Sequence, residues 1–421
     1  MDGQARGLGR LAGIAIAGAL AGGCAQLGPI ALQDTRIQYN EVVKATTEEQ
    51  LLLNIVRLRY TDTPSSLAVS AIAAQFERTQ SVQLIPFFTS AGADINRSFT
   101  TILPGGQIQG ADRPTFSLTP LDDQDFTRKL FTPLPLDAII YLAKTTWPIS
   151  TVFRLYLENL NWVPNAQTAS GPTPQRAPQV AEFLRGIDAL QSLQDGGRVV
   201  FAIEERSEIL GGPLPASAVT ARDVIEAAKS GYEYRIDGKT NTWTLTKKSV
   251  QPVLLVDPEA VGATEMREVA RAFHLKPGLL RYEITQEALN PFPSTYPSDG
   301  VENLDLETRS LLQALYFVSH GIEVPPEHAN AGLVTVTRED AGQVYDWRQV
   351  TQGLFRVRSS SGETRPSGAH VATRYHGYWF YIDETDQVTK ATFSLLMELA
   401  RLELGAKTGS GPTLTLPLGG R

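Results

Sequence analysis

The residue whose chemistry the sequence indicates most clearly is Cys24, the only cysteine in the 421-residue chain. Two arginines precede an apolar run that starts at residue 11 and leads directly to this cysteine, and the last three residues before it are Ala-Gly-Gly. A basic start, a short apolar core and small residues at the end are the parts of a secretory signal. The run is about 14 residues long, shorter than the roughly 20 that a membrane-spanning helix needs. The sequence therefore predicts a signal peptide at residues 1–23.

The segment Leu20–Cys24 resembles the lipobox of bacterial lipoproteins, although Ala21 stands where leucine is commoner. The resemblance implies that Cys24 becomes the first residue of the mature protein and carries acyl chains such as palmitate. Two or three such chains anchor a protein far better than one. By the same resemblance, Ala25 in place of aspartate implies a location on the periplasmic face of the outer membrane. The alternative is an ordinary signal peptide in which the cysteine occurs by chance.

The composition excludes some classes of partner. The formal net charge is −7 at pH 7, and lysine and arginine do not cluster along the sequence. A mildly acidic chain of this kind is poorly suited to bind nucleic acid or anionic lipid headgroups. Apolar residues make up 42% of the chain, which is enough to build a substantial core. With its one cysteine taken by the anchor, the chain is expected to form no disulfide.

Residues that could catalyse a reaction do not form a recognisable motif. No HExxH sequence and no pair at helical spacing occurs among the five histidines, so no metal site is expected; they are His274, His320, His328, His370 and His376. The glycine-rich pieces lack the spacing of phosphate-binding loops, and no cofactor is expected. Carboxylates are plentiful, and a glycosidase pair among them would not be visible from sequence spacing. The sequence therefore assigns no catalytic residue.

One patch favours binding rather than catalysis, namely the aromatic segment from Tyr375 to Tyr381. On a single alternating strand, Tyr375, Trp379 and Tyr381 would lie on one face, and two further aromatic residues would lie on the other. Aromatic residues on both faces favour a strand that is buried between layers. The alternative is a platform for a sugar or for peptidoglycan, which would need one open face. We take Tyr375, Trp379 and Tyr381 as candidate binding residues.

The clearest structural element lies just after a polar connector at residues 25–46. The motif TEEQ at residues 47–50 has the form of a helix capping box. An apolar stretch from Leu51 to Tyr60 follows at once, and its apolar residues occupy most of the circumference of a helix. The sequence predicts a helix that begins near residue 47 and is buried on several sides, with Leu52 and Val56 in the core.

The rest of the chain mixes helices with hairpins. Short β-rich runs separated by glycine and proline predict strands between residues 82 and 118, and three helical stretches follow before residue 161. Residues 165–178 contain no large apolar side chain and are rich in proline, serine and glycine, which is typical of a linker or a long surface loop. An Asp-Gly turn at residues 237–238 predicts a β-hairpin, and a helix at 386–404 follows the aromatic strand. This mixture favours an α+β fold with mainly antiparallel sheets.

The predicted organisation has six parts. A tether connects the signal peptide to an N-terminal α+β domain, and a linker or long loop separates that domain from a C-terminal α+β domain with an extended tail. In the tail, the alternating residues 413–416 could add an edge strand to the protein's own sheet or to that of a partner. The alternative, which we favour, is a tail that is tied onto the protein's own body. The boundaries of the six parts are 1–23, 24–46, 47–164, 165–178, 179–405 and 406–421.

Three segments resemble a group of uncharacterised bacterial lipoproteins: QLLLNIVRLRY at 50–60, RYHGYWFYID at 374–383 and TLTLPLG at 413–419. The resemblance supports the lipoprotein assignment and implies no activity or catalytic residue. Together with the anchor, it favours a non-enzymatic, lipid-anchored periplasmic protein that acts as a scaffold or binding component of a cell-envelope assembly. Its expected contacts are the membrane, an envelope protein partner and, as a further option, peptidoglycan. The alternative is an envelope hydrolase that acts on glycan or ester bonds.

Overall fold

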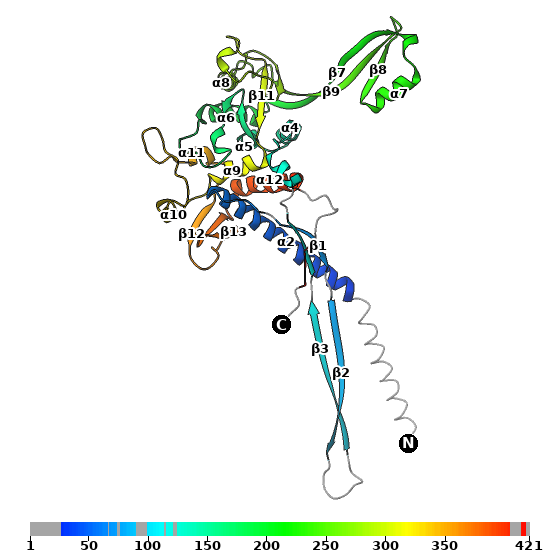
Figure 1. The fold of residues 1–421 in the computed structure, drawn as a ribbon, viewed down its shortest axis with the longest axis vertical. Coiled ribbons are helices and arrows are strands. Elements are labelled where there is room, and N and C mark those ends of the chain that lie inside the picture. Colours follow the sequence, from blue (N-terminus) through cyan, green and yellow to red (C-terminus); the bar gives the residue numbers. More distant parts are fainter. Residues whose placement is uncertain are drawn as a thin grey trace. The chain divides into compact units, whose positions relative to one another are not determined.

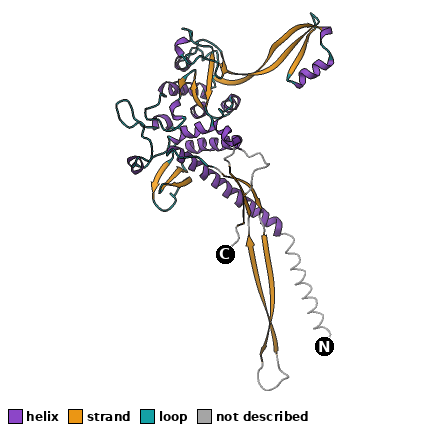
Figure 2. Cartoon of the chain, viewed as in Figure 1, coloured by secondary structure: helices purple, strands orange, loops and turns teal. Residues whose placement is uncertain are grey.

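The computed structural model describes residues 27–65, 67–73, 76–89, 99–112, 115–120, 124–404 and 414–417 (Figures 1 and 2). The chain divides into two compact units. Unit 1 comprises residues 1–47, 65–124 and 404–421, and unit 2 comprises residues 48–64 and 125–403. The predicted signal peptide and Cys24 lie outside the described residues. Within the described residues the fold is α+β with mainly antiparallel sheets, as predicted.

The first described element is helix α2 (Leu27–Arg59), which is much longer than expected. Residues 27–46, predicted as a polar connector, are helical, and the predicted capping box at 47–50 is wrong. The hydroxyl of Thr47 donates to the carbonyl oxygen of Val43 at 2.6 Å instead of capping a helix end. Threonine can satisfy its hydroxyl in this way inside a helix, so a capping motif in the sequence need not mark a helix start.

The second half of α2 is buried, as predicted. Leu52, Ile55 and Val56 have no exposed surface. The helix is followed by a turn at Thr61, whose backbone φ is 60°. The apolar circumference of residues 51–60 therefore identified a core helix correctly, although it did not locate the helix start.

The described part of unit 1 contains two small antiparallel sheets. Strands β1 (Leu67–Ala73) and β15 (Leu414–Pro417) pair with the two edges of β4 (Thr115–Pro120). Strands β2 (Phe76–Thr89) and β3 (Phe99–Asp112) form a hairpin in which all 14 residues of each strand are paired. The alternating residues near the C-terminus thus add an edge strand to the protein's own sheet, which is one of the predicted options.

Unit 2 is organised around a seven-stranded sheet of order β6-β5-β11-β10-β9-β7, with β8 paired to β9 as well. Only β10 and β11 run parallel, and the other neighbours are antiparallel. The strands are β5 (Leu157–Leu160), β6 (Val163–Pro164), β7 (Val199–Pro215), β8 (Tyr232–Asp237), β9 (Thr242–Val256), β10 (Arg281–Thr285) and β11 (Asn303–Thr308).

Helices pack with this sheet to form the core of unit 2. The ring of Phe153 lies 5.5 Å from that of Phe201 in β7, and the ring of Phe183 lies 5.9 Å from that of Phe273. A Cβ atom at Gly186 would lie 2.5 Å from the Phe273 ring, so glycine is required for this close approach. The helices are α4 (Leu136–Lys144), α5 (Ile149–Tyr156), α6 (Ala181–Asp195), α8 (Thr264–Ala272) and α9 (Leu311–Ser319).

A smaller antiparallel sheet of order β12-β14-β13 completes unit 2 together with helix α12 (Gln387–Leu404). Its strands are β12 (Arg358–Ser361), β13 (Ala369–Tyr375) and β14 (Tyr378–Asp383). The shorter helices are α3 (Gln124–Phe131), α7 (Ala221–Lys229), α10 (Pro326–Asn330) and α11 (Arg348–Thr351).

Residues 165–178, predicted as a linker or long surface loop, lie inside unit 2. Asn165, Ala169 and Ser170 are buried. The side-chain nitrogen of Asn165 donates to the carbonyl oxygens of Arg154 and Leu157, at 2.8 and 2.7 Å. Small polar residues allow this segment to pack closely while satisfying buried backbone groups, so its linker-like composition did not indicate an exposed boundary.

The longest strands of unit 2 form a two-stranded arm. β7 and β9 pair from Val199↔Val256 to Pro215↔Thr242, whereas β10 accompanies β9 only at residues 253–255. We call residues 203–252 the arm; beyond the body of the sheet it carries β8 and α7 (Figure 1). The predicted Asp-Gly hairpin is confirmed as the turn between β8 and β9.

Candidate functional site

The predicted lipidation site, Cys24, lies outside the described residues, and its modification stays a prediction. None of the described helices is both long and apolar enough to span a membrane. No group of three or more histidine, cysteine, aspartate or glutamate side chains in the described part of the chain is arranged to hold a metal ion.

The aromatic segment predicted as one strand is a hairpin. β13 ends at Tyr375 and β14 begins at Tyr378, so that these two tyrosines pair across the turn. The turn residues His376 and Gly377 have backbone φ angles of 45° and 83°. Prediction of a single strand from Tyr375 to Tyr381 is therefore wrong, because a His-Gly turn interrupts it.

The turn separates the three candidate binding residues. Tyr375 shares a face with Tyr378 and with Phe380, which has no exposed surface. Trp379 and Tyr381 lie on the opposite face and are half-buried. The indole nitrogen of Trp379 is buried and has no hydrogen-bond partner. Tyr375, Trp379 and Tyr381 thus do not form one platform, and only Trp379 and Tyr381 share a face.

Tyr375 instead belongs to a packed aromatic cluster. The ring of Tyr60, at the end of α2, lies 5.2 Å from that of Tyr375 and 6.0 Å from that of Phe380. The Tyr60 hydroxyl and Nδ1 of His328 are 2.6 Å apart. The Tyr375 hydroxyl donates to Asp62 at 2.9 Å, and this hydrogen bond lowers the pKa of Asp62. These contacts hold the end of α2 against the small sheet.

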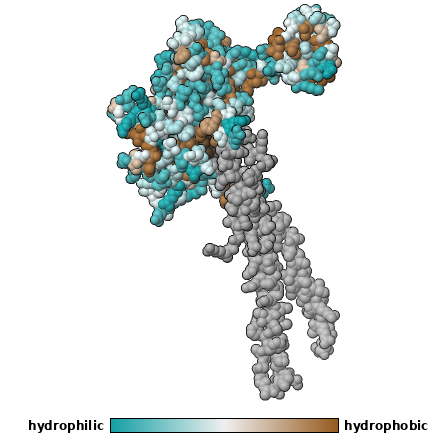
Figure 3. All heavy atoms as spheres, in the orientation of Figure 1, coloured by the Kyte–Doolittle hydropathy of each residue, from teal (hydrophilic) through white to brown (hydrophobic). Residues whose placement is uncertain are grey.

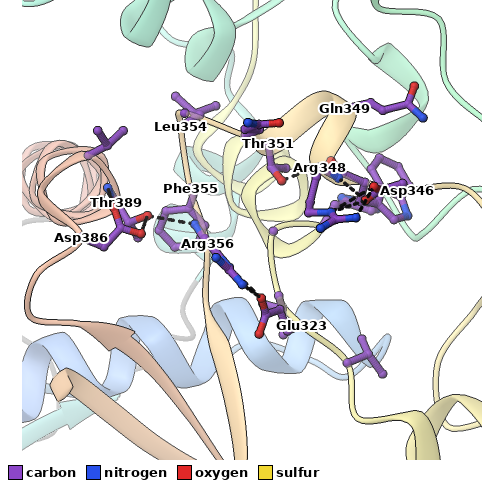
Figure 4. A pocket seen from close by; sticks show the side chains of 18 residues that line it. Glu323, Asp346, Arg348, Gln349, Thr351, Leu354, Phe355, Arg356, Asp386 and Thr389 are labelled. Carbon is purple, nitrogen blue, oxygen red and sulfur yellow. Dashed lines mark hydrogen bonds and ion pairs between the residues drawn. The ribbon is translucent and has the colours of Figure 1, made fainter. Parts of the chain in front are cut away.

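A cleft in unit 2 has a volume of about 830 Å³ (Figure 4). Three segments line it: residues 320–324 after α9, residues 346–356 around α11, and residues 386–389 at the start of α12. Such a volume is within the range of small-molecule sites, roughly 300–1,000 Å³. The cleft contains none of the candidate residues from the aromatic segment.

The carboxylates that line this cleft are all held by neighbours. Arg356 Nε donates to Glu323 at 2.6 Å, and the Nε and Nη2 atoms of Arg348 donate to the two carboxylate oxygens of Asp346 at 2.9 and 2.7 Å. The hydrogen bonds from Arg348 lower the pKa of Asp346. These arginine–carboxylate pairs are visible in Figure 4.

The third carboxylate, Asp386, caps α12. It accepts hydrogen bonds from the backbone nitrogen and the hydroxyl of Thr389, at 3.0 and 2.8 Å. A general acid needs a carboxyl whose pKa is raised toward neutrality, usually by burial without a cationic partner. Among the described lining residues no carboxyl has that environment, because arginines hold Glu323 and Asp346 and Asp386 caps a helix.

A neutral histidine stacks against one wall of the cleft. The ring of His320 lies 3.9 Å from that of Trp347, and its Nδ1 is 2.8 Å from the carbonyl oxygen of Tyr316. Burial lowers the pKa of His320 to about 3. The Nε2 of His320 and the indole nitrogen of Trp347 are buried without a partner. His320 is therefore uncharged near neutral pH and cannot act there as a proton donor through Nε2.

Sequence reasoning did not find this cleft. Its three lining segments are separated by tens of residues, and their acidic and basic residues occur in no known motif. The capping role of Asp386 is the one part of it that the residue order could indicate, because aspartate before a helix is a common cap.

Comparison of the chain with models of protein families, with characterised proteins and with solved structures gave no match.

Proposed function

We propose that this protein is a lipid-anchored component of the bacterial cell envelope, on the periplasmic face of the outer membrane, that binds a protein partner through its arm. The anchor part of the proposal rests on the sequence Leu20–Cys24, which resembles a lipobox. The binding part rests on one structural observation, the exposure of apolar side chains on the arm.

Among the residues whose side-chain exposure the structure describes, sixteen large apolar side chains are exposed, and six of them lie on the arm. The exposed fraction is 57% for Ile225 in α7 and 52% for Ile236 in β8. Helix α7 has no buried residue, although one face of it is apolar. Figure 3 shows apolar residues along the arm and at its end. Exposed apolar patches on a soluble unit are typical of protein interaction sites.

The alternative function, hydrolysis of an envelope glycan or ester, has less support. A retaining or inverting glycosidase needs two carboxyl groups about 5–10 Å apart, one of which donates a proton. In the cleft, arginines and a helix cap hold Glu323, Asp346 and Asp386. A binding role therefore accounts better for the described side chains.

The proposal is tested by chemical cross-linking of envelope proteins in intact cells, followed by purification and mass spectrometry. Ile225→Asp and Ile236→Asp place a charge on the arm and should remove the main cross-linked partner. Val344→Asp is the matched control, since Val344 is 63% exposed and lies off the arm. A partner that is retained equally by all three variants would overturn the binding role of the arm.

A further inference from the structure

One edge of strand β7 pairs with no other strand in the described part of the chain. Strand β7 is the last strand in the order of the sheet, and β9 is its one strand partner among the described strands. Pairing with β9 is regular from Val199 to Ile209, and register shifts follow at 209/211 and 211/214. The six residues 205–210 are all exposed. An edge of this kind presents free backbone N–H and C=O groups to any strand that fits beside it.

The residues of this edge are complementary to themselves. When two identical strands pair antiparallel about a two-fold axis, the axis passes through one residue and its copy, and the neighbours pair across it. An axis at Ser207 places Arg206 of each copy opposite Glu208 of the other. An axis at Glu204, Glu205, Arg206 or Glu208 places two like charges directly opposite each other, which is destabilising. Within residues 204–208, Ser207 is thus the one centre that places no like charges opposite each other, and a centre at Ile209 would lie directly beside the register shift at 209/211.

The two charged residues differ in the contacts they make within one copy. Glu208 is exposed and has no ion-pair partner among the described residues. Arg206 bonds Glu283 of β10 through Nη2, on the far side of β9 from the free edge, so Arg206 must exchange this partner for Glu208 of the second copy when the edges pair. Both side chains lie on the same face of the sheet, because residues two apart on a strand share a face.

We propose that two copies of this protein associate through antiparallel pairing of their β7 edges, centred on Ser207. The bulges after Ile209 confine the contact to a few residues on each side of the axis. A short ladder predicts a weak dimer. The inference is argued from the backbone edge and the charges of β7, although Ile209 and Leu210 on that edge are also among the exposed apolar residues of the arm. Ile225→Asp and Ile236→Asp lie off β7 and therefore test the proposed function separately.

A symmetric disulfide tests the register. In the full chain carrying Cys24→Ser, Ser207→Cys introduces a single cysteine, which would face its own copy across the axis. Directly opposite residues have Cα atoms about 4.5–5.5 Å apart, a distance that a disulfide can bridge. The matched variants are Glu205→Cys and Glu208→Cys, which lie on the same exposed strand but would face Ile209 and Arg206.

Mild oxidation should give at least about fivefold more covalent dimer from Ser207→Cys than from either matched variant, because only the central residue meets its own copy. Equal cross-linking of all three variants, or none at Ser207→Cys, would overturn the proposed register.

A charge exchange tests the association without a covalent bond. In Glu208→Arg, the new arginine would lie opposite Arg206 of the other copy, once on each side of the axis. This repulsion should raise the dissociation constant of the dimer roughly tenfold. The double variant Arg206→Glu with Glu208→Arg should restore dimerisation in sedimentation experiments. Thermal unfolding of each variant checks that the altered contact with Glu283 leaves the fold intact. A wild-type protein that stays monomeric at the highest soluble concentration, or a folded double variant that does not dimerise, would overturn the proposal.

Discussion

Arg309 Nη2 donates a hydrogen bond to the backbone carbonyl oxygen of Asn165 at 2.5 Å, so a fully buried cation holds the segment that follows β6. The guanidinium also donates to Ser170 and to carbonyl oxygens of α5, and it lies 3.9 Å from the centre of the Phe317 ring. Burial lowers the pKa of Arg309 to about 9. Hydrogen bonds and a cation–π contact, rather than a direct ion pair, accommodate this charge.

Replacement of Arg309 is therefore expected to lower the stability of the folded protein. Arg309→Met leaves several buried acceptors without a donor and should lower the free energy of unfolding by about 3–5 kcal/mol. Arg309→Lys should also destabilise, since an ammonium cannot reproduce the planar set of donors. Urea denaturation measures both, with the exposed Arg222→Met as control, for which a change within about 0.5 kcal/mol is expected. A stability of Arg309→Met equal to that of the control would contradict this account.

The buried half of α2 gives a second prediction. Leu52→Ala and Val56→Ala remove side chains with no exposed surface and should each cost about 1–5 kcal/mol through lost burial and a residual cavity. Val42→Ala, in the same helix but 57% exposed, should change stability much less. The midpoints of thermal unfolding distinguish these outcomes, and equal midpoints for all three variants would show that the packing of residues 51–60 is not as described.

Neighbouring aromatic residues of β14 should differ in their contributions to stability. Phe380 has no exposed surface, whereas Trp379 is half-buried on the other face. We expect Phe380→Ala to cost about 3–5 kcal/mol and Trp379→Ala clearly less, because less apolar area is lost at the half-buried site. If Trp379 and Tyr381 contact peptidoglycan, a folded Trp379→Ala protein will lose retention on purified sacculi. Retention of Trp379→Ala equal to that of the wild-type protein would contradict the prediction that this face binds peptidoglycan.

His320 predicts a specific dependence of stability on pH. Its folded-state pKa is lowered by burial to about 3, below its ordinary value of 6.5. Between these values the unfolded chain binds the extra proton, so this contribution to stability is complete above pH 6.5 and is lost as the pH falls toward 3. The unfolding midpoint of wild type should therefore fall more steeply across this window than that of His320→Phe, which keeps an aromatic ring beside Trp347 but cannot be protonated. Parallel curves would contradict the buried neutral state of His320.

The anchor is tested separately from the fold. Cys24→Ser should abolish acylation and release the protein into the soluble periplasmic fraction. Intact-mass analysis of the wild-type protein should show the added mass of the acyl chains. An unmodified Cys24 in mature wild-type protein would refute the lipoprotein assignment.

Local features of the fold were readable from the sequence wherever a short-range pattern decides the structure. The apolar circumference of residues 51–60 marked a buried helix, and the Asp-Gly pair at 237–238 marked the hairpin of β8 and β9. Helix α12 was expected at 386–404 and is observed at Gln387–Leu404. In each case the hydrophobic period or the turn residues act within a few positions, so no distant partner is needed.

Tertiary structure alone decided the features that depend on residues far apart in the chain. Residues 165–178 have the composition of a linker, but Asn165 and Ser170 are buried, and Arg309, more than 130 residues later, donates hydrogen bonds to both. Tyr375, Trp379 and Tyr381 do not form the predicted platform, because a turn at His376 reverses the chain and places Tyr375 on the face opposite Trp379 and Tyr381. The cleft likewise unites three separate segments. Local conformations often differ little in energy, so contacts between distant residues decide which of them forms. Local preferences can be read from a single sequence, whereas these distant contacts cannot.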